Sequence, residues 1–192
     1  KDGKKLEINN EQESKAILEE LKGASYRVDE VEKKETKRNP AAPFTTSKLQ
    51  QEASRKLGYT AKKTMMLAQQ LYEGVDIGED NPVGLISYMR TDSTRISNEA
   101  TSAAREFISA RFGAEYLPAK PNIYKSKKKA QDAHEAIRPT YFQYTPESVA
   151  KHLSKDQLKL YQLIWNRFIA CQMNPAIIDQ TRVQIGAKGY TF

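Results

Sequence analysis

A tyrosine and an arginine two residues apart form the pair in this sequence best suited to covalent chemistry. Tyr88 and Arg90 lie in the apolar run 83–90, which predicts a short strand with both side chains on one face. A phenol with its pKa of about 10 is a weak nucleophile, but a neighbouring permanent cation lowers that pKa and can hold a phosphate. The hydroxyl-rich turn 91–94 adds further donors, and the helix that follows adds the positive end of its dipole. The pair therefore predicts attack on a phosphodiester, although an ordinary strand tyrosine beside an exposed arginine explains the same residues.

A histidine and an arginine four residues apart form a second candidate. If residues 133–137 make one helical turn, His134 and Arg138 lie on one face. There they could hold a phosphate, and His134 could protonate a leaving oxygen. A surface histidine near a helix end remains the alternative.

Other polar and aromatic side chains carry weaker signals. The basic run 125–129 indicates a solvated loop or a non-specific phosphate contact, and Trp165 and Cys171 indicate core packing of a long helix. Neither histidine lies near the cysteine and no Asp-x-Asp-x-Glu set occurs, so no metal site is predicted. His152, in a lysine-flanked run, carries no signal.

The charge of the chain is basic and unevenly placed. Among 192 residues the net charge is +7, and the excess lies beyond residue 43 because residues 1–43 are balanced. Such a surface indicates a polyanionic partner, most often nucleic acid, or ordinary charge scatter.

Composition excludes several classes of protein. No run approaches the roughly 18 apolar residues of a membrane-spanning helix, and the single cysteine excludes a disulfide scaffold. That cysteine usage fits a reducing compartment, so we expect a cytoplasmic location. No signal peptide is expected, and both ends indicate a piece cut from a longer polypeptide.

Hydrophobic periodicity predicts strands at both ends and a helical block between them. Strands are expected at residues 5–8, 26–36, 83–90, 181–185 and 190–192. Helices are expected from Asn10 to Gly23, from Thr46 or Ser47 to Gly58, from Thr60 to Gly74, over 98–112 after Ser97, after Thr145, and over 156–173. A linker is expected at 39–43, where two prolines occur. The fold class is thus α+β and mainly helical, with the helical block inserted in a small β domain.

The two helices between residues 47 and 73 admit two interpretations. A helix, a glycine, a short turn and a second helix have the spacing of a DNA-reading helix-turn-helix unit. Plain packing of a helical hairpin produces the same pattern.

Four segments together resemble one family. Residues 84–97, GLISYMRTDSTRIS, resemble the active-site tyrosine motif of type IA DNA topoisomerases. Residues 43–74 resemble the stretch before that motif in the bacterial branch, and residues 132–140 and 160–173 resemble two further signatures. All four occur in the family order, so chance is a poor explanation.

The resemblance implies a role for each candidate residue. Tyr88 is the nucleophile that holds a DNA 5′-phosphate, Arg90 contacts the scissile phosphate, and His134 contacts the DNA backbone near the cut. Arg138 and Asp92 fall within the matching motifs and support the site. Residues 44–175 correspond to a helical gate domain, and residues 1–43 and 176–192 to a β domain that acts as arch and hinge.

The resemblance also implies parts that this sequence lacks. The Mg²⁺-binding acidic cluster and a proton-transferring lysine belong to a separate Toprim domain, which no segment matches. We therefore expect no cofactor in this piece, Mg²⁺ in the full-length enzyme, single-stranded DNA and the other domains as partners, and no activity of the piece alone. A non-enzymatic DNA-binding module and a structural domain with an incidental basic surface are the alternatives.

Overall fold

The chain folds as an α+β protein with two compact units. In the computed structural model, which describes residues 1–3, 5–124 and 134–192, one unit comprises 1–38 with 176–192 and the other comprises 39–175. The basic run 125–129 lies outside the described residues. None of the helices in the described ranges is both long and apolar enough to cross a membrane.

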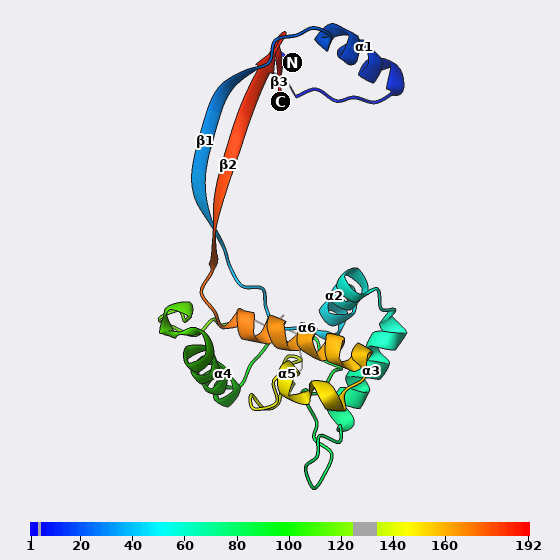
Figure 1. Cartoon of the computed structure of the whole chain (residues 1–192), viewed down its shortest axis with the longest axis vertical. Coiled ribbons are helices and arrows are strands. Elements are labelled where there is room, and N and C mark those ends of the chain that lie inside the picture. Colours follow the sequence, from blue (N-terminus) through cyan, green and yellow to red (C-terminus); the bar gives the residue numbers. More distant parts are fainter. Residues whose placement is uncertain (4, 125–133) are drawn as a thin grey trace. The chain divides into compact units, whose positions relative to one another are not determined.

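The first unit is built on a long antiparallel ladder. Strand β1 (Arg27–Arg38) pairs with β2 (Ala176–Ala187), and β2 pairs with the short β3 (Tyr190–Thr191) (Figure 1). The predicted pairing of strands from the two ends of the chain is therefore present. Nearly all side chains of β1 are exposed, because none of the other described elements of this unit packs on its faces.

Helix α1 (Glu11–Leu21) precedes the ladder and has the predicted ends. The Asn10 side chain accepts the N–H of Glu13, and Gly23 has a φ of 64°. None of the α1 side chains is buried. The strand predicted at 5–8 is wrong, since these residues are exposed and have no partner strand among the described residues.

The second unit is helical, and its helices begin where hydroxyl side chains predict. The longer ones are α2 (Thr46–Leu57), α3 (Ala61–Glu73), α4 (Asn98–Phe112) and α6 (Lys155–Cys171). Short turns form η1 (Ala114–Tyr116), α5 (Pro146–Val149) and η2 (Ala150–His152). Side-chain oxygens of the N-cap residues accept first-turn N–H groups at Thr45, Thr60, Ser97, Thr145 and Ser154.

The predicted cap of α2 is wrong by one residue. Thr45 has extended backbone angles and accepts the N–H of Lys48, so it is the N-cap in place of Thr46 or Ser47. Thr46 is already helical, and its hydroxyl bonds to another segment. Helix α2 ends, as predicted, at Gly58, whose φ of 70° favours glycine.

Helix α6 supplies much of the core. Trp165 and Cys171 are buried, as predicted, and so is Tyr161, whereas Leu158 and Leu163 are only partly buried. The ring of Trp165 lies edge-on to Phe107 of α4, with centroids 5.3 Å apart. Apolar burial and these ring contacts hold α4 and α6 together.

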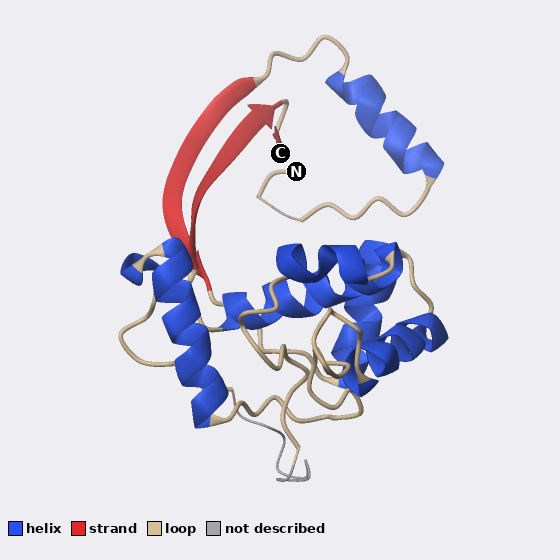
Figure 2. Cartoon of the chain, turned by 60° about the horizontal axis from the view of Figure 1, so that its bottom comes forward, coloured by secondary structure: helices blue, strands red, loops and turns tan. Residues whose placement is uncertain are grey.

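Two segments predicted as regular elements are irregular. Residues 83–90 form no strand, and Figure 2 shows strands only in the unit built from 1–38 and 176–192. Isolated bridges join Val75 to Val83 and Ile86 to Pro139 instead. The helical turn predicted at 133–137 is also wrong for its described residues, because the Ile137 N–H donates to Phe44 O at 2.8 Å in place of a helical bond.

Candidate active site

The segment that carries Tyr88 and Arg90 starts at the end of α3. The N–H of Leu85 donates to the carbonyl of Leu71 at 2.7 Å. A Cβ placed on Gly84 would lie 2.6 Å from the carbonyl oxygen of Tyr72, so only glycine fits this close approach. The end of α3 therefore fixes where the segment begins.

Residues 136–138 hold the middle of the segment that carries Tyr88. The Ser87 N–H donates to Arg138 O at 2.9 Å, and the Ser87 hydroxyl donates to Ala136 O at 2.7 Å. The same hydroxyl accepts the Arg138 N–H at 2.9 Å. Two of the motifs recognised in the sequence, 84–97 and 132–140, are thus joined directly at Ser87.

Thr46 at the start of α2 holds the residues that flank Arg90. Its hydroxyl donates to Met89 O at 2.8 Å and accepts the Thr91 N–H at 2.8 Å. Its backbone N–H donates to Thr91 O at 2.9 Å. Three contacts to one threonine fix the backbone on both sides of the arginine.

Exposure alternates along this segment although it belongs to no sheet. Tyr88, Arg90 and Asp92 are exposed, while the residues between them, Met89 and Thr91, are buried. Tyr88 and Arg90 are therefore both on the outer side of the segment. The predicted strand would also have placed them on one face, but no strand forms here.

Two aromatic rings flank Tyr88, which is 40% exposed. The Tyr72 ring lies edge-on with centroids 5.3 Å apart, and the His134 ring lies 5.8 Å away. The structure thus brings His134 to Tyr88. Sequence reasoning placed Tyr72 only as a helix residue, and no local signal connects it to Tyr88.

Arg138 is placed differently from the prediction. Its guanidinium binds Glu135 through two 2.7 Å contacts and donates to Pro139 O at 2.9 Å. Because residues 134–138 are not helical, His134 and Arg138 do not share a helical face. By contrast, neither Arg90 nor Asp92 forms an ion pair with any described residue.

Two hydroxyls of the turn 91–94, those of Thr91 and Ser93, do not serve as open donors. Thr91 and Ser93 are buried at 7% and 2% exposure. The Thr91 hydroxyl accepts the Ser93 N–H at 3.0 Å, and the Ser93 hydroxyl accepts the Arg95 N–H at 3.1 Å. These two side chains shape the backbone, which corrects the prediction that they present donors to a phosphate.

Two clusters of charged side chains join α6 to the helices α2 and α3. Burial acts to raise the pKa of Glu52, but Lys56, Arg55 and Arg167 outweigh it and lower that pKa overall. Arg167 also lies over the Phe44 ring, 4.6 Å from its centroid. Phe44 in turn pairs with the segment that contains His134.

The second cluster joins α6 to the turn between α2 and α3. Asp156 accepts hydrogen bonds from Lys63 at 2.6 Å and Tyr59 at 2.8 Å, which lower its pKa. Burial, with help from that carboxylate, raises the pKa of Tyr59 to about 12. Tyr59 therefore stays a neutral donor and serves the fold.

Metal ligands are not gathered in the part of the chain that the structure describes. No three His, Cys, Asp or Glu side chains there lie close enough to hold an ion. Asp92, the carboxylate nearest in sequence to Tyr88, therefore does not fit a metal site on its own.

Comparison with known proteins agrees with the sequence motifs. A family model described as DNA topoisomerase matches residues 1–192. DNA topoisomerase 1 of Rickettsia felis is 56% identical over 176 residues, covering 91% of this chain and 23% of that protein. DNA topoisomerase 1 of Campylobacter jejuni is 56% identical over 180 residues, covering 93% of this chain and 26% of that protein. The chain thus spans about a quarter of the length of these relatives.

A solved structure is also similar. Full-length topoisomerase I from Thermotoga maritima matches with a TM-score of 0.75 and 43% identity. The match covers 97% of this chain and 29% of that one.

Proposed function

The chain belongs to the DNA topoisomerase family, and from this premise we propose that it carries the nucleophile of a type IA enzyme. In this proposal Tyr88 cuts one DNA strand, a second strand passes, and the cut is resealed, which relaxes negative supercoils. The observation that carries the proposal is the outward placement of Tyr88 and Arg90 on a segment fixed by α2, α3 and residues 136–140.

The proposed covalent step exchanges one phosphate ester for another. The Tyr88 oxygen bonds to the phosphorus as the phenol loses its proton, and the bond from phosphorus to the deoxyribose 3′ oxygen breaks. That oxygen takes up a proton and leaves as a 3′-hydroxyl. Resealing is the reverse, and because the ester conserves the bond energy it needs no ATP.

Arg90 is the proposed phosphate ligand. It is exposed, lies two residues from Tyr88 and has no ion-pair partner among the described residues. A guanidinium can bind two phosphate oxygens at once and stabilise the charge that develops during transfer. Since none of the described carboxylates occupies its guanidinium, Arg90 is suited to that role.

The remaining site residues have smaller proposed roles. His134, which contacts the Tyr88 ring, contacts the DNA backbone beside the cut. Arg138, which the sequence suggested as a DNA ligand, is engaged by Glu135, so in this proposal it supports the segment that carries His134. Asp92 is likewise assigned only support.

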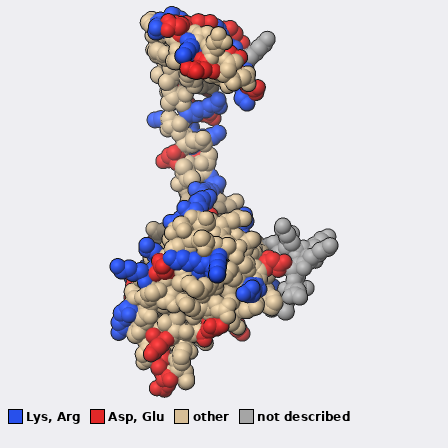
Figure 3. All heavy atoms as spheres, turned by 90° about the vertical axis from the view of Figure 1, so that its right-hand side faces the viewer, with Lys and Arg blue, Asp and Glu red and all other residues tan. Residues whose placement is uncertain are grey.

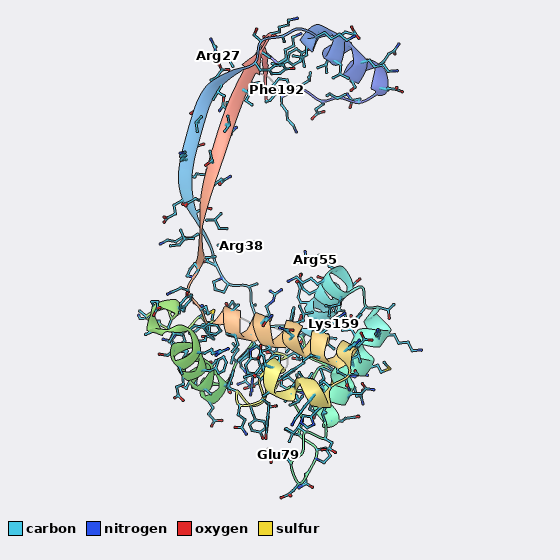
Figure 4. The ribbon with its side chains drawn as sticks, in the orientation of Figure 1. Arg27, Arg38, Arg55, Glu79, Lys159 and Phe192 are labelled. Carbon is cyan, nitrogen blue, oxygen red and sulfur yellow. The ribbon has the colours of Figure 1, made fainter. Side chains whose placement is uncertain are left out.

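The proposed partner is single-stranded DNA. On the face that Figure 3 shows, Lys and Arg gather in a band on the helical unit with some Asp and Glu among them, and further Asp and Glu lie toward its lower end. Figure 4 places Arg55 and Lys159 on α2 and α6. Binding is expected to weaken by about 0.7 log units per log unit of salt for each phosphate neutralised.

Other parts of the enzyme are proposed to complete the site. Mg²⁺ and the proton-transferring lysine belong to a Toprim domain, whose motifs this sequence does not contain. Residues 44–175 act as the gate, and 1–43 with 176–192 act as arch and hinge. We expect the chain alone neither to cleave nor to relax DNA appreciably.

A chimera tests the proposal. This chain replaces the matching region of the Campylobacter jejuni relative, and the chimera receives Mg²⁺ and a 3′-labelled single strand. Denaturant then stops the reaction. We expect label on the protein, because the retained fragment bears the 5′-phosphate, and none with Tyr88→Phe. Unlabelled chimera, or label that persists in Tyr88→Phe, would overturn the proposal in favour of a binding module.

A further inference from the structure

A shallow groove beside Tyr88 has no role in the reaction proposed above. It has a volume of about 460 Å³ and lies between the loop after α3 and the segment before α5. This volume falls within the range of about 300–1,000 Å³ typical of small-ligand sites. Three tyrosines and two carboxamides contribute to its walls: Tyr72, Tyr141, Tyr144, Asn81 and Gln143.

Tyr72 connects the groove to the nucleophile. Its ring lines the groove and also packs on the Tyr88 ring. Gly84 and Ile86, from the segment that carries Tyr88, line the groove as well. A DNA strand joined to Tyr88 through a phosphate therefore has this space next to it.

The chemistry of the lining favours a neutral, flat group. None of the described residues that line the groove carries a charge. Tyr72 and Tyr141 are 41% and 54% exposed, so their rings are open to stacking. The amides of Asn81 and Gln143 offer both donors and acceptors to the edge of a base.

The charges around the groove favour a base inside it and a phosphate outside it. The Tyr144 hydroxyl lies 3.4 Å from Glu79, so a carboxylate stands at the rim and repels phosphate. Figure 4 shows Glu79 at the end of the loop after α3. Arg90, which is exposed and has no ion-pair partner among the described residues, attracts phosphate instead. We propose that the groove binds one nucleobase of the strand that Tyr88 cleaves, an inference that rests on the proposed function.

Binding to strands with and without bases tests this inference. The affinity of the chain is measured for a thymidine oligonucleotide and for an abasic strand of equal length. Tyr141→Ala should weaken binding of the thymidine strand about tenfold and leave the abasic strand unchanged. Tyr116→Ala, which removes a 49% exposed tyrosine outside the groove, should change neither.

Photo-crosslinking adds a readout that does not depend on a variant. A strand containing 5-iododeoxyuridine is irradiated with the unaltered chain, and the crosslinked peptide is identified by mass spectrometry. We expect it to contain Tyr72, Tyr141 or Tyr144. Crosslinks elsewhere, or equal affinity of the chain for base-bearing and abasic strands, would overturn the groove assignment. Neither readout requires the Tyr88 adduct, so failure of the groove is distinguished from failure of the proposed reaction.

Discussion

The ring of Tyr72 packs edge-on against the ring of Tyr88, with centroids 5.3 Å apart and ring planes at 64°. The carbonyl of Tyr72 also stands against Gly84, where a side chain would clash. One residue at the end of α3 thus fixes both the start of the segment and the side chain proposed to react. The position of Tyr88 consequently depends on a helix that lies earlier in the sequence.

Removal of the Tyr72 ring should slow adduct formation. An edge-on aromatic pair contributes about 1 kcal/mol, so Tyr72→Ala in the chimera should lower the rate of labelling about fivefold. Tyr72→Phe keeps the ring and should stay within about twofold of the unaltered chimera. A time course of labelling measures both variants, and equal losses in the two would refute a role for the ring.

A methyl group at Gly84 should displace the whole segment. Because the Cβ would lie 2.6 Å from a backbone oxygen, Gly84→Ala should lower the free energy of unfolding by about 2 kcal/mol and reduce labelling. Gly58→Ala is the control, since Gly58 has a positive φ but open space around it. It should cost about 1 kcal/mol without loss of labelling. Urea unfolding checks both, and a Gly84→Ala chain of unaltered stability would contradict the geometry.

The loss of Arg90 should affect chemistry and leave the fold intact. Arg90→Ala in the chimera should lower the rate of adduct formation about 10²- to 10³-fold, while Arg90→Lys, which keeps the charge but loses the planar fork, should lower it less. Unfolding free energy should change by less than about 0.5 kcal/mol, because the side chain is exposed. Arg111→Ala, at an exposed position of α4, should leave the rate unchanged. A similar loss in both alanine variants would indicate a general charge effect.

Stability should decline at alkaline pH through Cys171. Burial raises the pKa of its thiol from 9.0 to about 12. The unfolded thiol therefore ionises first, so its contribution is complete below pH 9 and is lost as the pH rises toward 12. Between pH 9 and 10 the slope should approach about 1.4 kcal/mol per pH unit. Urea unfolding across this range measures it, and Cys171→Ala should be less stable but show a flatter slope. An unchanged slope in Cys171→Ala would contradict a buried neutral thiol.

Local signals were sufficient to predict most helix ends. Thr60 and Ser97 cap their helices because the hydroxyl and the N–H that it accepts lie within three residues. The strand pairing of the chain ends also followed from alternating sequences near each terminus. At the start of α2 the prediction of Thr46 or Ser47 failed: Thr45 is the cap, and a distant segment occupies the Thr46 hydroxyl.

Predictions failed where distant segments satisfy the backbone. Residues 83–90 have the composition of a strand, but their polar groups bond to α2, α3 and residues 136–140 in turn. No single segment in the described part of the chain forms a ladder with them, so no strand results. Residues 134–138 form no helical turn for a similar reason, because the Ile137 N–H bonds to Phe44 O.

The residues of the candidate site were also only partly predictable from the sequence. Residue type and spacing singled out Tyr88 and Arg90 as candidates beside an ordinary explanation, and the family resemblance assigned their roles. The structure shows both side chains exposed. Tyr72 and Thr46 were not found. Both residues contact the segment that carries Tyr88 from distant positions in the sequence. No sequence spacing indicates these contacts.

The most direct test of the central claim is to locate the DNA on the protein. The chimera is incubated with Mg²⁺ and a single strand, denatured and digested, and the peptide that carries a nucleotide is sequenced by mass spectrometry. We predict a single modified peptide with the phosphate ester on the Tyr88 oxygen, absent from Tyr88→Phe. A nucleotide on any other residue, or an unmodified Tyr88 in a chimera that still relaxes supercoiled DNA, would contradict it.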